Sequence, residues 1–299
     1  MEIEAVKESF RKENPPSQSQ KLFELALGLD LNEPARYEFL RRSVEGCDAP
    51  YPWAGIYLGN LYDNGVVLNG AELLPQDYEK ARKCYEAAAK CDGTGVAAWL
   101  IGSGYEDENY GKGLDKLQRE EIALQWYEKS AKYHYGKAYS SIGKFSLYGK
   151  GGKEADTIKA TQEFDKAKEC GDTFSAAINL AYAYKKEGRH DHADRLFAEA
   201  VDSKSPLAYY QYAEFLFTYG QAAGYSESEA MEKAKQNYEN ARHSCGLYSA
   251  LSCYRLMVHY TDVDRSQLKK ESIKGFEAFC SRGNTLRGEA ETIYNILKA

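Results

Sequence analysis

An alanine followed four residues later by an aromatic residue recurs along the whole chain. The six copies are Ala35/Phe39, Ala81/Tyr85, Ala123/Tyr127, Ala160/Phe164, Ala193/Phe197 and Ala234/Tyr238. Successive aromatic residues lie 33 to 46 residues apart, which suits a helix pair that stacks on copies of itself. The spacing therefore predicts a repeat protein, an architecture that favours binding over catalysis.

Each repeat is predicted to contain two helices with different sequence signatures. In the first helix, small and apolar residues share one face, as Ala54, Leu58 and Gly59 do. The glycine lowers helix propensity, and close approach of a neighbouring helix would compensate for that cost. The second helix begins at a capping residue such as Asp77 and carries the alanine and the aromatic residue. We assign to packing the motif tyrosines Tyr62, Tyr85, Tyr105, Tyr127 and Tyr148.

Glycine-rich stretches of different lengths separate the two helices of a pair. Residues 65–76 are the first such stretch, which we predict to be a loop. Variable loops explain why the length of the repeat varies. In stacked repeats such insertions collect on one edge, where they can contact a partner.

Several copies of this pattern resemble the Sel-one-like repeat family, a branch of the tetratricopeptide-like α/α solenoids. The motif residues that carry the resemblance are Leu58-Gly59, Leu61-Tyr62, Lys80-Ala81, Tyr85 and Ala88-Ala89, and residues 123–131 restate the second half closely. The resemblance covers about residues 34–284 and implies an all-α superhelical solenoid of about six helix pairs. We expect residues 1–33 to form N-terminal capping helices and residues 285–299 a C-terminal capping helix.

The resemblance also implies a function. Members of the family look like adaptors that assemble complexes, so we expect a non-enzymatic scaffold that binds a protein or peptide along its concave face or its loop edge. A narrower version is an immunity or inhibitor protein that neutralises a toxin, because an acidic surface would suit a basic partner. The family spans too many roles for the fold to select a particular partner.

Composition narrows the classes of partner. A formal charge of −6 over 299 residues does not suit a groove that follows a phosphate backbone, so we predict no nucleic-acid ligand. No apolar run is long enough to cross a bilayer, and residues 1–15 lack the apolar core of a signal peptide. We therefore expect a cytoplasmic protein without membrane insertion, of undetermined oligomeric state.

First helices line the inner surface of tetratricopeptide-like solenoids, so residues between their packing positions are the candidates for binding. Aromatic side chains among them are attractive anchors, because they carry much of the energy at protein interfaces. The lining residues that we predict are Asn60, Trp99, Ser103, Lys144, Tyr182, Lys185, Tyr210 and Glu214. For any one aromatic residue, packing between helices is an equally good interpretation.

An enzyme is the alternative from a different class, because a cysteine-rich subgroup of the family is linked to β-lactam binding or hydrolysis. The seven cysteines of this chain show no recurring paired spacing, so we expect reduced thiols. His190 and His192, with Asp194 nearby, could ligate zinc in a metal-dependent hydrolase. They also fit the turn into a second helix, where residues two apart do not share a face. We therefore predict no catalytic residue, no metal and no cofactor.

Overall fold

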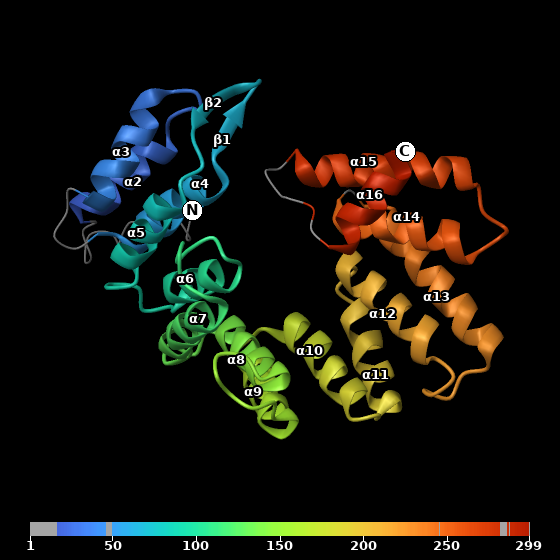
Figure 1. The fold of residues 1–299 in the computed structure, drawn as a ribbon. Coiled ribbons are helices and arrows are strands. Elements are labelled where there is room, and N and C mark those ends of the chain that lie inside the picture. Colours follow the sequence, from blue (N-terminus) through green and yellow to red (C-terminus); the bar gives the residue numbers. More distant parts are fainter. Residues whose placement is uncertain (1–16, 46–49, 245, 282–285, 287, 299) are drawn as a thin grey trace, which may run out of the picture. The chain divides into compact units, whose positions relative to one another are not determined.

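The computed structural model describes residues 17–45, 50–244, 246–281, 286 and 288–298. Across these residues the chain is a succession of α-helices with one β-hairpin (Figure 1). The elements are α2 (Gln18–Leu27), α3 (Pro34–Glu45), α4 (Pro52–Asn64), β1 (Val66–Leu68), β2 (Ala71–Leu74), α5 (Tyr78–Ala88), α6 (Val96–Glu106), α7 (Lys116–Ala131), α8 (Gly136–Tyr148), α9 (Thr157–Glu169), α10 (Thr173–Lys186), α11 (His190–Val201), α12 (Pro206–Tyr219), α13 (Glu227–Arg242), α14 (Leu247–His259), α15 (Arg265–Cys280) and α16 (Glu289–Lys298). No helix in these ranges combines the length and the apolar character that crossing a bilayer requires.

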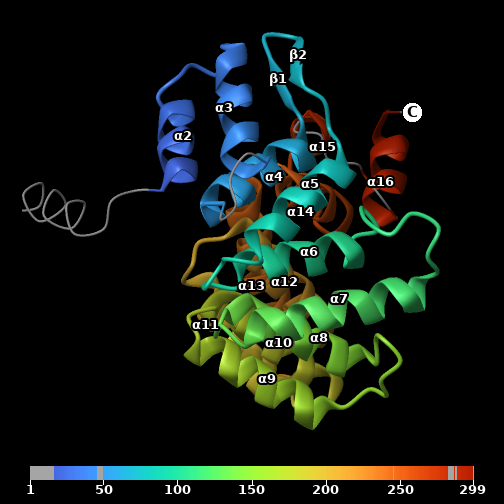
Figure 2. The ribbon, with the colours of Figure 1, turned by 90° about the vertical axis from the view of Figure 1, so that its left-hand side faces the viewer.

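The helices pack in consecutive pairs, as the sequence predicts. Contacts join α4 with α5, α6 with α7, α10 with α11, α12 with α13, and α14 with α15. In Figure 2, α6 and α7 lie side by side, and α2 lies beside α3. The predicted all-α, α/α solenoid fold is therefore confirmed. The α2 helix packs on α3, and α16 packs on α15; the separation of residues 1–33 and 285–299 from a solenoid over 34–284 stays a prediction.

The helices group into two compact units. Unit 1 comprises residues 1–145 and 149–154, and unit 2 comprises residues 146–148 and 155–299. The α8 helix contributes to both, because its last three residues group with unit 2. Unit 1 thus holds α2 to α7 with the hairpin, and unit 2 holds α9 to α16.

The alanine and aromatic positions form the core of the stack in five of the six copies. The buried pairs are Ala81/Tyr85, Ala123/Tyr127, Ala160/Phe164, Ala193/Phe197 and Ala234/Tyr238. The first-helix glycine explains how a ring of this size fits. A Cβ atom at Gly59 would lie 2.4 Å from a ring carbon of Tyr85, so a side chain there would displace the ring. The predicted close approach is confirmed.

Two predictions about the core are wrong, one for the first alanine–aromatic pair and one for a motif tyrosine. In α3, Ala35 is exposed and Phe39 half-buried, whereas Leu40 is fully buried. The buried face of α3 is therefore offset by one residue from the predicted one. Tyr148 is 54% exposed, and it is the last residue of α8.

The motif tyrosines do more than fill space. The hydroxyl of Tyr85 donates to Asp63 at 2.8 Å, and that of Tyr127 donates to Glu106 at 2.8 Å. In unit 2 the hydroxyl of Tyr238 donates to Glu214 at 2.5 Å. Each bond joins the second helix of a pair to a carboxylate on its first helix. A buried phenol needs such a partner, so these bonds fix the register within the pair.

The stretch predicted as a loop at residues 65–76 is a β-hairpin. Strand β1 pairs antiparallel with β2, and Asn69 and Gly70 form the turn with φ angles of 51° and 81°. Two consecutive residues with positive φ are typical of the type I′ turn that joins two strands, for which Asn-Gly is the preferred pair. The Asn-Gly pair between two apolar runs was the signal that could have predicted the hairpin.

Candidate functional site

The predicted lining residues divide between the two units. Unit 1 contains Asn60 on α4, Trp99 and Ser103 on α6, and Lys144 on α8. Unit 2 contains Tyr182 and Lys185 on α10, and Tyr210 and Glu214 on α12. The structure brings the four unit 2 residues together around one pocket of about 320 Å³, which we call the unit 2 pocket.

The walls of the unit 2 pocket are largely aromatic. The rings come from Tyr182, Phe197, Tyr210, Phe215 and Tyr219. They support one another through edge and stacked contacts, with centroids 5.5 Å apart for Tyr182 and Phe197, and 5.9 Å apart for Phe215 and Tyr219. Tyr210 is buried, whereas Tyr182 and Tyr219 stay partly exposed. Tyr210 therefore supports the pocket, and the other two tyrosines can touch a ligand.

Lys185 is the cation of this pocket. Its ammonium nitrogen lies 4.4 Å from the ring centre of Tyr182 and 5.5 Å from that of Tyr219. No carboxylate in the described part of the chain forms an ion pair with it. Burial lowers the pKa of Lys185, because the pocket removes water from the ammonium group. The two rings compensate for part of this loss by attracting the cation to their faces.

Glu214 is the acid of the pocket, and it is already neutralised. Arg255 on α14 donates to it from Nε at 2.8 Å and from Nη2 at 3.1 Å, in addition to the bond from Tyr238. Arg255 also reaches Glu289 on α16 at 3.0 Å. These bonds tie α12, α14 and α16 together, so Glu214 serves mainly to hold the helices that shape the pocket.

Aromatic residues continue beyond the pocket on the first helices of unit 2. The ammonium nitrogen of Lys186 on α10 lies 5.8 Å from the ring centre of Tyr148, the last residue of α8. Tyr210 and Tyr248 have ring centres 5.8 Å apart. Tyr148 is therefore next to α10, and Tyr248 on α14 is next to a residue that lines the pocket. We call the surface formed by α10, α12 and α14 the unit 2 face.

The predicted lining residues of unit 1 are satisfied by their own neighbours. The indole Nε1 of Trp99 donates to Ser141 at 3.1 Å, and Ser103 donates to Asp107 at 3.1 Å. Lys144 pairs with Glu106 at 4.0 Å. Asn60 is exposed, and its side chain accepts a bond from Tyr85 at 3.0 Å. The structure places these residues on first helices, and each is bonded to a neighbour within unit 1.

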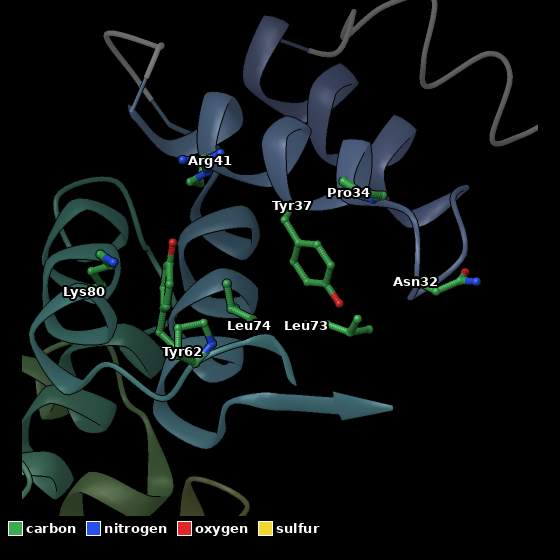
Figure 3. Close-up of a pocket in the computed structure, with 9 residues that line it drawn as sticks. Asn32, Pro34, Tyr37, Arg41, Tyr62, Leu73, Leu74 and Lys80 are labelled. Carbon is green, nitrogen blue, oxygen red and sulfur yellow. The ribbon is translucent and has the colours of Figure 1, made fainter. Parts of the chain in front are cut away.

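Unit 1 has a pocket elsewhere, which the sequence did not predict. It has a volume of about 330 Å³ and lies between α3, α4, the strand β2 and the start of α5 (Figure 3). Tyr37, Tyr62, Leu73 and Leu74 give it an apolar lining, and Arg41 and Lys80 add positive charge. Arg41 pairs with Glu38 and Lys80 with Asp77, so both cations have anionic partners. The pocket depends on the hairpin, which supplies Leu73 and Leu74, and the sequence predicts a loop there.

The two histidines considered as metal ligands are not brought together. His190 stacks on Tyr219 with centroids 4.9 Å apart, whereas His192 lies against Tyr184 at 5.3 Å. Asp194 accepts bonds from Tyr212 and Tyr225. Within the described ranges, no group of three or more His, Cys, Asp or Glu side chains could hold a metal. The five described cysteines, Cys84, Cys91, Cys170, Cys253 and Cys280, are free thiols.

The fold is similar to those of several solved repeat proteins. A protective antigen of uropathogenic Escherichia coli with an SLR fold is similar at a TM-score of 0.62, with 19% identity over 94% of this chain and 60% of that one. A Sel1 repeat protein from Oxalobacter formigenes is similar at 0.62, with 18% identity over 91% of this chain and 98% of that one. Yeast Tom70 is similar at 0.53, with 14% identity over 95% of this chain and 65% of that one.

These likenesses show that the chain has the SLR fold, the Sel1-like repeat arrangement of helix pairs. The resemblance found in the sequence is thereby confirmed at the level of the fold. The chain spans less than two thirds of the Escherichia coli antigen and of Tom70. No family model matches the sequence, and no curated protein is similar to it in sequence.

Proposed function

We propose that the protein is a non-enzymatic interaction scaffold and that it binds a protein or peptide segment on the unit 2 face. The observation that carries this proposal is the unit 2 pocket, where partly exposed tyrosines surround a lysine that has no anionic partner among the residues the structure describes. Aromatic residues at the centre of an interface supply large contact areas at low entropic cost, and they dominate measured binding energies.

The neighbouring surface supports the same conclusion. Phe217 on α12 is 36% exposed and Val258 on α14 is 48% exposed, so apolar side chains continue away from the pocket. The ring of Phe217 lies 4.2 Å from that of His259, which supports it from α14. A helix or an extended segment of a partner could therefore cover several of these side chains at once.

Blocking the pocket with a bulky side chain tests the proposal. Thr218 is exposed and lines the unit 2 pocket, so Thr218→Trp would fill it without disturbing the core. Peptides selected from a random displayed library on the wild-type protein should bind this variant at least about tenfold more weakly, by fluorescence polarisation. Circular dichroism would confirm that the variant is folded.

Two matched tryptophan substitutions act as controls. Thr173→Trp places the same side chain on α10 outside the pocket, and Asn60→Trp places it on an exposed first-helix position of unit 1. Both should bind the selected peptides as the wild type does. Equal binding by Thr218→Trp, or loss confined to Asn60→Trp, would contradict the proposal.

A further inference from the structure

The unit 2 pocket contains a positive charge that no carboxylate in the described part of the chain neutralises. Glu214 lines the same pocket, but Arg255 and Tyr238 occupy its carboxylate oxygens. Lys185 is left with the faces of Tyr182 and Tyr219. Among the described residues, then, the charges balance around Glu214 and not around Lys185.

An unpaired ammonium group at a half-buried position is a disfavoured arrangement. Contacts with aromatic faces compensate for only part of the lost hydration. When a partner covers the pocket, water leaves and the remaining charge becomes more costly unless an anion enters with the partner. A partner that supplies a carboxylate would gain a charge-assisted hydrogen bond from Lys185 in the same step.

The lining of the pocket can accommodate such a carboxylate. Gln211 and Thr218 line it beside Lys185, and their amide and hydroxyl groups can donate to a second oxygen atom. The exposed parts of Tyr182 and Tyr219 offer ring surface to an adjacent apolar side chain. The pocket thus suits an acidic residue next to an apolar or aromatic one.

The position of the pocket distinguishes a side-chain carboxylate from a chain terminus. Tyr148 comes from α8, before the pocket helices in the stack, and Tyr248 comes from α14, after α10 and α12. Tyr148 lies against Lys186 of α10, and Tyr248 lies against Tyr210 of α12. A segment lying along these tyrosines would continue past Lys185 in both directions, so its carboxylate would come from within the segment.

Building on the function proposed above, we infer that the partner inserts an internal Asp or Glu side chain into the unit 2 pocket, where its carboxylate pairs with Lys185. An adjacent apolar or aromatic residue of the partner covers Tyr182 and Tyr219. The partner is therefore a protein segment with an acidic residue beside an apolar one, and recognition depends on a single buried charge pair.

A double-mutant cycle on selected peptides tests the inference. Random peptides displayed with fixed sequence on both sides should yield binders that share an Asp or Glu beside an apolar residue. Replacing that acid by its amide, or introducing Lys185→Gln, should each weaken binding about tenfold or more, the range for one side of a charge pair. The two changes together should cost little more than either one, because both remove the same contact.

Charge-matched variants separate this contact from a general effect of charge or folding. Lys274→Gln removes one charge from an exposed site on α15 and should leave binding unchanged. Lys185→Arg keeps the charge and should retain more affinity than Lys185→Gln. Raising the salt concentration should weaken binding to the wild type more than to Lys185→Gln.

The outcomes distinguish the inference from the function on which it rests. Peptides that Thr218→Trp excludes, but that share no acidic residue or bind Lys185→Gln equally well, would overturn the inference and leave the proposed function standing. Peptides that need a free C-terminal carboxylate, and fail when amidated there, would also overturn it. Peptides that bind Thr218→Trp normally would instead contradict the proposed function.

Discussion

The first-helix faces of the two units follow the same repeat register but differ in how their polar groups are satisfied. In unit 1, Trp99 bonds to Ser141, and Lys144 pairs with Glu106. In unit 2, Glu214 is paired, whereas Lys185 has no ion pair among the described residues. The repeat therefore sets where a side chain lies, and contacts between successive repeats decide whether it remains open to a partner.

The packing beneath the two faces differs as well. Unit 1 has Gly59 and Gly102 at the first-helix position that faces the ring of the second helix, and a Cβ atom at Gly102 would lie 2.6 Å from a ring carbon of Tyr127. Unit 2 has the buried residues Ala181 and Ala213 at the equivalent positions. At these positions unit 1 therefore has no side chain facing the ring of the second helix, whereas unit 2 has a methyl group.

The largest loss of stability should come from adding a methyl group at Gly102, where the first helix contacts the ring of Tyr127. Gly102→Ala should lower the free energy of unfolding by about 1–3 kcal/mol, because the ring of Tyr127 must move. The reverse change in unit 2, Ala181→Gly, should lower it by about 1 kcal/mol, through helix propensity. Urea denaturation followed by circular dichroism would measure both. A Gly102→Ala variant as stable as the wild type would show that the ring of Tyr127 does not require a glycine at this position.

Removing a lysine should have opposite consequences in the two units. Lys150 donates to Glu106 at 2.8 Å in unit 1, so Lys150→Met should destabilise the protein by about 1–2 kcal/mol. Lys185→Met removes an ammonium group that lacks an ion pair, so stability should stay constant or rise. Thermal unfolding of the two variants at neutral pH would compare them. Equal destabilisation would show that Lys185 has a stabilising partner.

The dependence of stability on pH also separates Lys185 from a lysine that has an ion pair. The folded-state pKa of Lys185 lies below its ordinary value of 10.5, so the unfolded chain binds the proton more tightly. The free energy of unfolding therefore rises as the pH increases from the folded-state pKa to 10.5 and levels off above 10.5, and Lys185→Met should lack that rise.

Glu106 in unit 1 should make stability depend on pH in the acid range, because its pKa is lowered by ion-pair partners, whereas Lys185 has none among the described residues. Burial alone would raise its pKa, but Lys144, Lys150 and Tyr127 together hold it below its ordinary value. Its contribution is present above the ordinary value and is lost as the pH falls through the lowered pKa. Glu106→Gln should show a smaller loss on acidification than the wild type.

Much of the fold followed from the sequence, because the alanine–aromatic spacing depends on local periodicity. It failed at Ala35 and Phe39, where α3 buries the residue after each predicted position, since one apolar stripe can be read in two adjacent registers. The prediction of a loop at Asn69 and Gly70 is wrong, because glycine is common both in loops and in the tight turns of hairpins.

Half of the predicted lining residues gather at the unit 2 pocket, but their roles could not be read from sequence. The bond from Trp99 to Ser141 spans 42 residues, and the one from Arg255 to Glu214 spans 41. Such bonds depend on the geometry between successive repeats, which local periodicity does not specify. The unpaired state of Lys185 is visible only once these bonds are known.

The location of a bound peptide on the two units is the most direct test of the central claim. A selected peptide in which a photoreactive benzoylphenylalanine replaces its apolar residue would be cross-linked to the wild-type protein, and the adducts mapped by mass spectrometry. We predict adducts on α10 and α12, beside Tyr182 and Tyr219. Adducts concentrated on α4 and α6, or in the unit 1 pocket beside the hairpin, would contradict the assignment of binding to the unit 2 face.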